Sequence, residues 1–463
     1  MSIAAEPGLV TGSHPAPVGR AHWLDHWDPE DEKFWAEKGS RIARKNLWFS
    51  IFSEHIGFSV WTMWSTLVLF LGPNYGFTPA DKFALISTGA ACGAFLRLPY
   101  TFAIAKFGGR NWTIVSAALL LIPCILTVIL LEPGISYSTM MLLCMLAGFG
   151  GGNFASSMAN INNFYPARLK GWALGLNAAG GNLGVATIQL VGLLILATAG
   201  KEHPKMVVAV YIPFIVVATL GAALYMDNIT NATNEKRAMR EVTKDPHTWI
   251  MSFLYIGTFG SFIGFGFAFG QVLLVQFPEQ YDTPIKAAQM TFLGPLIGSI
   301  ARPVGGFMAD RFGGSLMTFW NFVTMAAFAI VVLVASKQHS LGLFLVGFIG
   351  LFVTSGFGNG TTYKMIPAIF KAKADLVAKS TDDAATTAAA AKHARRMSGA
   401  LIGIAGAIGA FGGVLVNIAC RQSFLHTKTG DSAYLSFVIF YGLCVAVTWF
   451  VYLRLSTKRL AGV

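Results

Sequence analysis

Two arginines, Arg97 and Arg302, lie inside long apolar runs of the sequence, where a permanently charged side chain is costly. Placing a guanidinium at the centre of a bilayer costs from about 2.5 to more than about 10 kcal/mol. Of the 22 acidic residues, all except Glu54 and Asp310 lie in the termini or in polar connections. A permanent carboxylate partner for both arginines is therefore not available, and a bound anion is the economical counter-ion. The planar guanidinium fork suits a small flat oxyanion, and the glycine, alanine and phenylalanine residues around it predict a compact pocket.

The composition shows what kind of protein holds these arginines. The chain has 463 residues, of which 54% are hydrophobic and 12% are charged, whereas a soluble domain has about 25% charged residues. Such a chain turns its surface to lipid and is a polytopic membrane protein. No nucleic-acid partner is expected, because cytoplasmic loops of membrane proteins account for the net charge of +12. The five cysteines are scattered through apolar runs and indicate neither a metal site nor a disulfide framework, and no cofactor is implied.

Twelve apolar runs are each long enough to form a membrane-spanning helix, so the predicted fold class is an all-α membrane protein. They lie at about 47–71, 83–105, 111–131, 138–164, 171–199, 206–226, 248–275, 287–308, 314–336, 341–368, 397–420 and 432–454. A charged connection divides the runs six and six. The predicted organisation is an N-terminal arm (1–46), an N-terminal six-helix bundle (47–226), a central loop (227–247), a C-terminal six-helix bundle (248–455) with an inserted loop (369–396), and a tail (456–463).

Lysine and arginine placement predicts the orientation of the chain. The termini and the even-numbered connections hold most of the cations, and the odd-numbered connections hold few. Because cytoplasmic loops are enriched in Lys and Arg, both termini, the central loop and the inserted loop are predicted to be cytoplasmic.

The two halves of the chain repeat one another. Arg97 is followed ten residues later by the sequence FGGR (107–110), and Arg302 is followed ten residues later by FGGS (312–315). Each arginine belongs to the second span of its own half. Two homologous bundles with polar ends predict a two-fold pseudo-symmetric transporter.

Several motifs resemble those of a known family. The sequence GGFMADRFGG (305–314) resembles the loop signature of the major facilitator superfamily, and its earlier copy departs from that signature at Ala105 and Lys106. Within the superfamily the chain resembles the nitrate/nitrite porter family. The motifs that carry this resemblance are LRLPY (96–100), GGNFASSMANINNFYP (151–166), GWALGLNAAGGNLG (171–184), YIGTFGSFIGF (255–265) and GFGNGTTYKMIPAIF (356–370).

The resemblance implies a function and further site residues. It implies transport of nitrate and nitrite across the plasma (inner) membrane by a monomer with the major facilitator fold, in the service of nitrate assimilation. It also implies that Phe154 and Phe259 hold the planar anion between their rings, and that Asn182 donates its amide to it. Tyr255 precedes Phe259 by four positions, hence shares its helical face, and could donate its hydroxyl.

The mechanism most consistent with these residues is exchange. Empty, the two arginines repel each other across a low-dielectric cavity, and a bound monoanion offsets this repulsion so that the halves can rock. Such a carrier returns only when loaded, which makes it a nitrate/nitrite antiporter.

Three alternatives to exchange are compatible with parts of the sequence. Glu54 and His55 are adjacent in the first span, and protonatable groups inside membranes often mark proton pathways, so nitrate–proton symport is the nearest alternative. An interfacial Glu54 paired with a loop cation explains this residue equally well. A membrane nitrate sensor would need a signalling domain, which is not apparent. An enzyme is not expected, because no catalytic constellation and no metal-ligand cluster occur.

Overall fold

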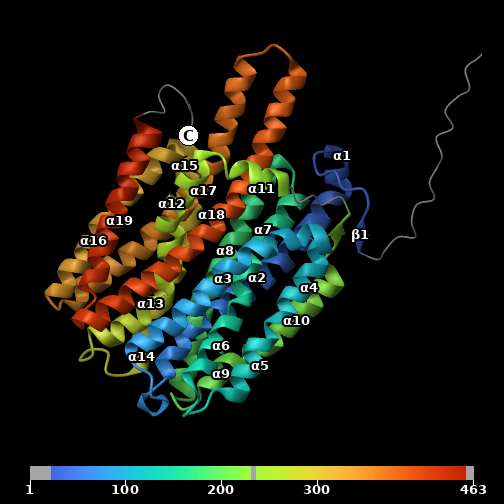
Figure 1. The fold of residues 1–463 in the computed structure, drawn as a ribbon. Helices are drawn as coiled ribbons and strands as arrows, with labels where there is room; N and C mark the ends of the chain where they lie inside the picture. Colours follow the sequence, from blue (N-terminus) through green and yellow to red (C-terminus); the bar gives the residue numbers. More distant parts are fainter. Residues whose placement is uncertain (1–21, 231–235, 455–463) are drawn as a thin grey trace, which may run out of the picture.

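Two bundles of helices lie side by side in the computed structural model, which describes residues 22–230 and 236–454 (Figure 1). Six helical rods form the N-terminal bundle in the described part of the chain, and three of them are interrupted at a single residue. They are α2 (Ser40–Phe70), α3 (Pro79–Phe107), α4 (Gly109–Leu119) with α5 (Leu121–Leu130), α6 (Tyr137–Ala147) with α7 (Phe149–Phe164), α8 (Ala167–Thr198), and α9 (Pro204–Ala209) with α10 (Tyr211–Tyr225).

The C-terminal bundle repeats this plan with six further rods. They are α12 (Pro246–Tyr255) continuing through the π-helical turn η3 (Ile256–Gly260) into α13 (Ser261–Gln276), α14 (Pro284–Thr291) with α15 (Leu293–Phe312), α16 (Gly314–Lys337), α17 (Leu341–Lys379), α18 (Ala384–Thr427), and α19 (Asp431–Thr448) ending in the π-helical turn η4 (Trp449–Leu453). Helix α3 packs against α18, and α8 packs against α15, so these four helices form much of the contact between the bundles.

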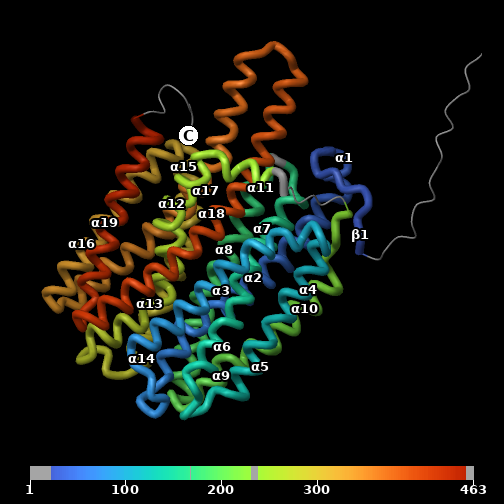
Figure 2. The backbone as a smooth tube through the Cα atoms, in the orientation of Figure 1, coloured from blue at the N-terminus to red at the C-terminus, as the bar shows by residue number. Residues whose placement is uncertain are grey.

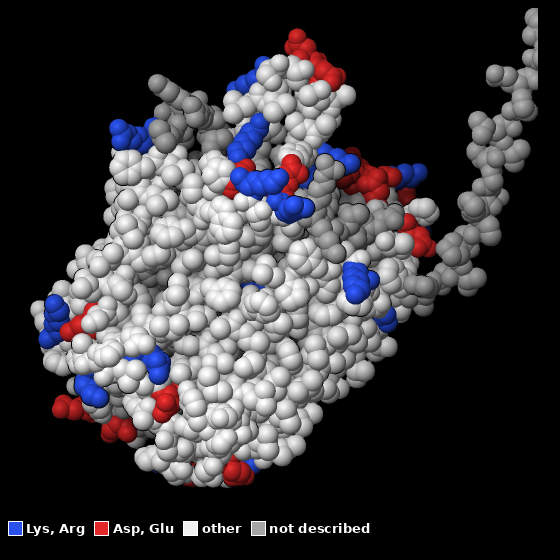
Figure 3. Space-filling view, viewed as in Figure 1, with Lys and Arg blue, Asp and Glu red and all other residues white. Residues whose placement is uncertain are grey.

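Ten rods within the described residues are long and apolar enough to cross a membrane. Helices α2 and α3 have 31 and 29 residues but are more polar, because they carry polar side chains on faces buried inside the protein. Most charged side chains on the face seen in Figure 3 gather toward the two ends, with a largely uncharged belt between. The predicted all-α membrane fold is therefore confirmed.

The repeated FGG motifs form the same turn in both halves. Helix α3 is capped at its end by Gly108, with φ of 86°, and α15 is capped by Gly313, with φ of 92°. A side chain with a Cβ rarely adopts this backbone conformation, so glycine permits the next helix to begin one residue later.

The described part of the N-terminal arm belongs to the fold. Strand β1 (Trp23–Leu24) pairs in parallel with β2 (Asn228–Ile229), just after the N-terminal bundle. The arm then forms α1 (Glu32–Phe34) and the π-helical turn η1 (Trp35–Gly39), which runs into α2. Trp27 donates its indole N–H to the Asn163 carbonyl at 3.1 Å, at the end of α7. This end of the molecule, where the arm lies, is called the arm end below, and the other is called the opposite end.

The segment 369–396 is a helical hairpin rather than a loop, which corrects the sequence-based expectation. Helix α17 continues to Lys379 and α18 begins at Ala384, so the hairpin projects beyond the bundle at the arm end (Figure 2). Its alanine-rich sequence has high helix propensity. Asp383 caps α18 by accepting hydrogen bonds from the amides of Ala385 and Thr386. The Thr386 hydroxyl and these amides hold the pKa of the Asp383 carboxyl below its ordinary value.

The two bundles contact each other firmly at the opposite end. Gln189 of α8 donates to the Gly266 carbonyl of α13 at 2.7 Å. The rings of Phe83 and Phe424 stack there with centres 5.7 Å apart. Both contacts join one bundle to the other, so the opposite end is closed in this conformation.

Candidate anion-binding site

Arg97 is fully buried and reaches from α3 across to the other bundle. Its Nη1 donates to the Gly406 carbonyl of α18 at 3.0 Å. Its Nε and Nη2 have no hydrogen-bond partner, and no described carboxylate forms an ion pair with it. The guanidinium instead rests among the rings of Phe58, Trp61, Phe154 and Phe259, at 4.6–5.9 Å from their centres. A desolvated cation is stabilised by such rings, while two of its N–H groups stay available to an anion.

Arg302 occupies the corresponding place in the C-terminal bundle. It is 5% exposed, and its Nη2 donates to the Tyr255 hydroxyl at 3.3 Å. Its guanidinium carbon lies 5.5 Å from the centre of the Tyr363 ring, and its Nη1 has no hydrogen-bond partner. Among the described carboxylates none pairs with Arg302, so both repeated arginines keep unused donors inside the protein.

Two stacked rings connect the arginines. Tyr255 and Phe259 stack with ring centres 5.2 Å apart and an angle of 11°, as their spacing of four residues predicts. They lie at the end of α12 and in the π-helical turn η3, and such turns are frequent at functional sites. Gly409 on α18 leaves room for the stack, because a Cβ there would lie 2.5 Å from the Tyr255 ring. The turn therefore places the Tyr255 hydroxyl against Arg302 and the Phe259 ring against Arg97.

A cavity of about 280 Å³ extends from Arg97 to the arm end. Of the predicted substrate-binding residues, Arg97 and Phe154 line it, whereas Arg302, Tyr255, Phe259 and Asn182 do not. Tyr363 and Gly406 also line it, and near the arm end so do Lys170, Arg395 and Arg396. Met239 of α11 (Lys236–Val242) lies against the same space.

The two predicted sandwich rings touch each other in this conformation. The ring centres of Phe154 and Phe259 are 5.9 Å apart, with an angle of 27° between their planes. A flat anion between two rings needs a separation of about 7 Å, twice the optimal van der Waals distance. The rings must therefore separate slightly before an anion can lie between them.

Asn182 is buried on α8 and forms no hydrogen bond with either arginine. Both polar atoms of its side chain lack a hydrogen-bond partner, and it is 1% exposed. An amide buried without partners is costly, so this side chain is suited to a polar ligand in another conformation.

Glu54 lies in a small polar network behind the cavity wall. It is fully buried, and its Oε2 accepts a hydrogen bond from Asn177 at 2.6 Å, while Oε1 has no partner. The Asn177 amide also donates to Ser157 at 2.6 Å and lies 3.5 Å from the sulfur of Met158, a cavity residue. No described cation pairs with Glu54, so the interfacial ion pair considered above is not formed.

His55 points to a different neighbour. Its Nδ1 lies 3.0 Å from the carbonyl oxygen of Gly180 on α8. The two adjacent titratable residues therefore have different hydrogen-bond partners, although both partners lie on α8.

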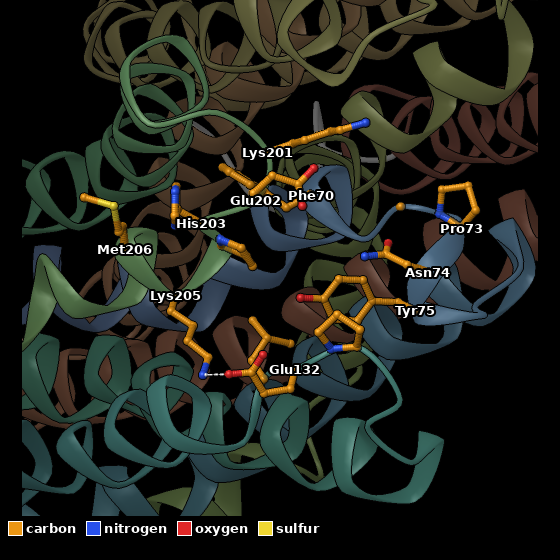
Figure 4. Close-up of a pocket in the computed structure, with 14 residues that line it drawn as sticks. Phe70, Pro73, Asn74, Tyr75, Glu132, Lys201, Glu202, His203, Lys205 and Met206 are labelled. Atoms are coloured by element: carbon orange, nitrogen blue, oxygen red, sulfur yellow. Dashed lines mark hydrogen bonds and ion pairs between the residues drawn. The ribbon is translucent and has the colours of Figure 1, made fainter.

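A larger cavity at the opposite end holds none of the predicted site residues. It measures about 630 Å³ and is lined by loops of the N-terminal bundle, including Tyr75, Lys201 and Glu202 (Figure 4). Lys205 and Glu132 form an ion pair across it. Its mixed charges and its position within one bundle separate it from the space beside Arg97.

Sequence reasoning missed several residues at the site. Tyr363 falls within a motif that carried the family resemblance, but its role as a neighbour of Arg302 was not inferred. Arg395 and Arg396 belong to the low-complexity stretch TTAAAAKHARR, where no local pattern distinguishes a cavity residue from a solvated one.

The sequence matches the model of the Major Facilitator Superfamily over residues 47–416. This chain belongs to the Major Facilitator Superfamily. The chain is also 37% identical to the Nitrate/nitrite transporter NarU of Salmonella typhimurium, over 94% of this chain and 97% of that one. It is 36% identical to NarU of Escherichia coli, over 93% of this chain and 96% of that one. It therefore belongs to the same family as these proteins, and the predicted family is confirmed.

Other comparisons agree with this major facilitator membership. The Probable nitrate/nitrite antiporter NarK2 of Thermus thermophilus is 29% identical over 94% of this chain and 98% of that one. The solved D-xylose-proton symporter matches with a TM-score of 0.64 at 14% identity, covering 89% of this chain and 97% of that one, and shows the fold. A bacterial homologue of the lysosomal transporter Spinster matches with a TM-score of 0.60 at 14% identity, covering 87% and 95%. This major facilitator protein is a multi-pass membrane transporter and not an enzyme.

Proposed function

We propose that this major facilitator protein transports nitrate and nitrite, with Arg97 and Arg302 as the anion-binding groups. The observation that carries the proposal is the pair of buried arginines, one from each bundle, whose unused N–H donors have no carboxylate to satisfy them. The family relationship to NarU supports nitrogen oxyanions as the substrate class. Nitrate and nitrite are planar and singly charged, which fits a guanidinium fork beside aromatic rings.

The proposed binding step begins at the free donors of Arg97. The anion accepts hydrogen bonds from the free Nε and Nη2 of Arg97 and separates Phe154 from Phe259 as it enters between them. Arg302 then approaches from the other bundle, with Tyr255 holding its guanidinium. Asn182 adds its unpaired amide when the halves close around the anion.

The proposed transport cycle is an exchange of nitrate for nitrite. Without an anion, moving the C-terminal bundle onto the N-terminal bundle brings two uncompensated guanidinium groups together in a medium of low dielectric constant. A monoanion between them removes this penalty. The loaded carrier can therefore rock and the empty carrier cannot, which makes transport in one direction depend on transport in the other.

The proposed orientation follows the cation distribution. The arm end, which carries the arm, the hairpin and most of the lysines and arginines, faces the cytoplasm of the inner membrane. The cavity from Arg97 extends to this end while the opposite end is closed, which under the proposed orientation is the arrangement of an inward-facing carrier. We propose that this carrier works as a monomer.

Proton-coupled uptake is a second candidate function. The observation in its favour is Glu54, a fully buried carboxyl group with one unpartnered oxygen and no ion pair among the described residues. The hydrogen-bond network of Glu54 lies next to the cavity residue Met158, so an anion in the cavity would change the affinity of the Glu54 carboxyl group for its proton. His55 would then serve as its adjacent protonatable group.

One flux experiment separates these functions. Purified protein is reconstituted into liposomes loaded with nitrite, nitrate or neither, and uptake of labelled nitrate is measured with and without an inward proton gradient. Uptake that needs internal anion and ignores the gradient establishes exchange. Uptake into empty liposomes driven by the gradient establishes symport. Saturable nitrate binding without nitrate uptake, either with internal anion or with a proton gradient, would instead indicate a sensor.

A further inference from the structure

The end of the cavity nearest the arm end, called its mouth below, is lined by the positively charged residues Lys170, Arg395 and Arg396. Every charged residue that lines the cavity is a cation: Arg97 at its inner end, and Lys170, Arg395 and Arg396 toward the arm end. Lys170 stands near the start of α8 in the N-terminal bundle, and the two arginines stand on α18, at the base of the hairpin, in the C-terminal bundle. Both bundles thus supply cations to one passage, and no acidic side chain lines it.

The start of α8 carries charges that oppose its own dipole. Its N-cap residue Pro166 provides no side-chain hydrogen bond, and its first turn holds no acidic residue. The turn holds Arg168 and Lys170 instead, although a helix N-terminus favours negative charge. Arg168 pairs with Glu32 at 3.4 Å, and the nearest acidic residue acting on Lys170 is Glu30, which does not line the cavity. An anion in the cavity beside Lys170 would add to this stabilisation of the cation and of the helix end.

We propose that Lys170 and Arg395, with Arg396 beside them, form a second anion site at the cavity mouth, which holds a small inorganic oxyanion on its way to or from Arg97. This inference rests on the proposed anion transport and adds a separate capture step on the arm side. The cavity of about 280 Å³, lined by the apolar side chains of Phe154 and Met158 besides its cations, suits a compact anion better than a bulky organic one.

The site has a defined physical consequence. A passage lined by cations in a low-dielectric wall concentrates anions and speeds their entry by about tenfold or more, and this effect weakens as salt screens it. The opposite end gains nothing from these residues. The effect must therefore be one-sided and salt-dependent, which a purely structural role of the same residues would not produce.

The test uses the full-length protein and nitrate as the probe. The double variant Lys170→Gln/Arg395→Gln is compared with Lys392→Gln, which removes an exposed cation of the same helix that does not line the cavity. In oriented proteoliposomes at low salt, the double variant should raise the half-saturating anion concentration on the arm side by about tenfold. The value for the opposite side should not change, and Lys392→Gln should behave as wild type on both sides.

Nitrate binding to the purified proteins in detergent separates this inference from the transport proposal. Calorimetric titration of Arg97→Lys should retain a weak, salt-sensitive binding phase, and adding the double substitution should remove it. Charge-conserving Lys170→Arg/Arg395→Lys should restore it, which distinguishes lost charge from misfolding. The mouth site would be overturned if the double substitution changed neither the half-saturating anion concentration on the arm side nor the weak binding phase of Arg97→Lys. The exchange proposal would still stand in that case. Wild-type protein that binds nitrate at the mouth without moving it would overturn the transport proposal and leave the mouth site standing.

Discussion

Arg97 on α3 and Gly406 on α18 join the two bundles through a single hydrogen bond of 3.0 Å from the guanidinium to the backbone carbonyl. Gly406 lines the cavity together with Phe154, whose ring centre lies 4.6 Å from the guanidinium carbon of Arg97. The empty site therefore holds its arginine in place by a backbone oxygen and aromatic rings rather than by a carboxylate. An anion can take up the two free N–H groups without first displacing an ion pair.

Arg97→Lys should lower nitrate/nitrite exchange by about 100-fold or more. Lysine keeps the charge but cannot donate to Gly406 and to both oxygens of an anion in one plane, and each charge-assisted hydrogen bond contributes about 1.5–3 kcal/mol. Exchange in proteoliposomes is the measurement. Arg41→Lys, at an exposed position at the start of α2, is the matched control and should retain full exchange. Wild-type exchange by Arg97→Lys would contradict the assigned role.

Tyr255→Phe should weaken anion binding about five- to tenfold while preserving the ring stack on Phe259. The change removes only the hydroxyl that positions Arg302, a hydrogen bond worth about 1 kcal/mol. Tyr441→Phe is the control, since it removes another buried hydroxyl contact of the same bundle, to Ser261 at 2.7 Å. Equal losses of affinity in both variants would point to a general effect on packing.

Glu54→Gln should leave exchange within about twofold of wild type. Glutamine retains an acceptor for the Asn177 amide and has nearly the same shape, so the buried network survives without a titratable group. Labelled nitrate uptake against internal nitrite, measured across a range of pH, tests this expectation. Loss of gradient-driven uptake in Glu54→Gln, where wild type shows it, would favour symport.

Gln189→Leu should weaken the closure of the opposite end. It removes the 2.7 Å hydrogen bond to the Gly266 carbonyl, one of the polar contacts between the bundles there. Spin labels at Lys201→Cys and Gln422→Cys, exposed on either side of that interface, should show a larger population of long distances. Gln276→Leu is the control, because its hydrogen bonds to Ser336 and Gly430 stay within one bundle. An unchanged distance distribution in Gln189→Leu would show that other contacts suffice.

Asn46→Ala should destabilise the arm end by about 1–3 kcal/mol. The Asn46 side chain exchanges two hydrogen bonds with Asp227, at 2.8 and 2.9 Å, where the N-terminal bundle leads into β2. Removing it leaves a buried carboxylate with fewer partners. Thermal unfolding in detergent measures the loss, and Asn74→Ala, in an exposed turn at the opposite end, should change it little.

The sequence alone was sufficient for the membrane class, the family and the two repeated halves. Those features follow from local sequence patterns, because the length of apolar runs, the placement of cations and recurring motifs do not depend on tertiary contacts. The burial of Arg97 and Arg302 could also be expected, since both charges lie within apolar runs of the sequence. The stack of Tyr255 on Phe259 was also predictable, because it depends on the pitch of one helix.

Contacts between distant segments depended on the tertiary structure. The Gly406 acceptor for Arg97, the closed spacing of Phe154 and Phe259, and the position of Arg395 beside the cavity each require two bundles to be packed in one conformation. The hairpin at 369–396 was misjudged as a loop, because its charged and low-complexity composition masked strong helix propensity. A local pattern records how a residue suits its own helix, whereas an acceptor or cavity wall on another helix is determined by packing between the bundles.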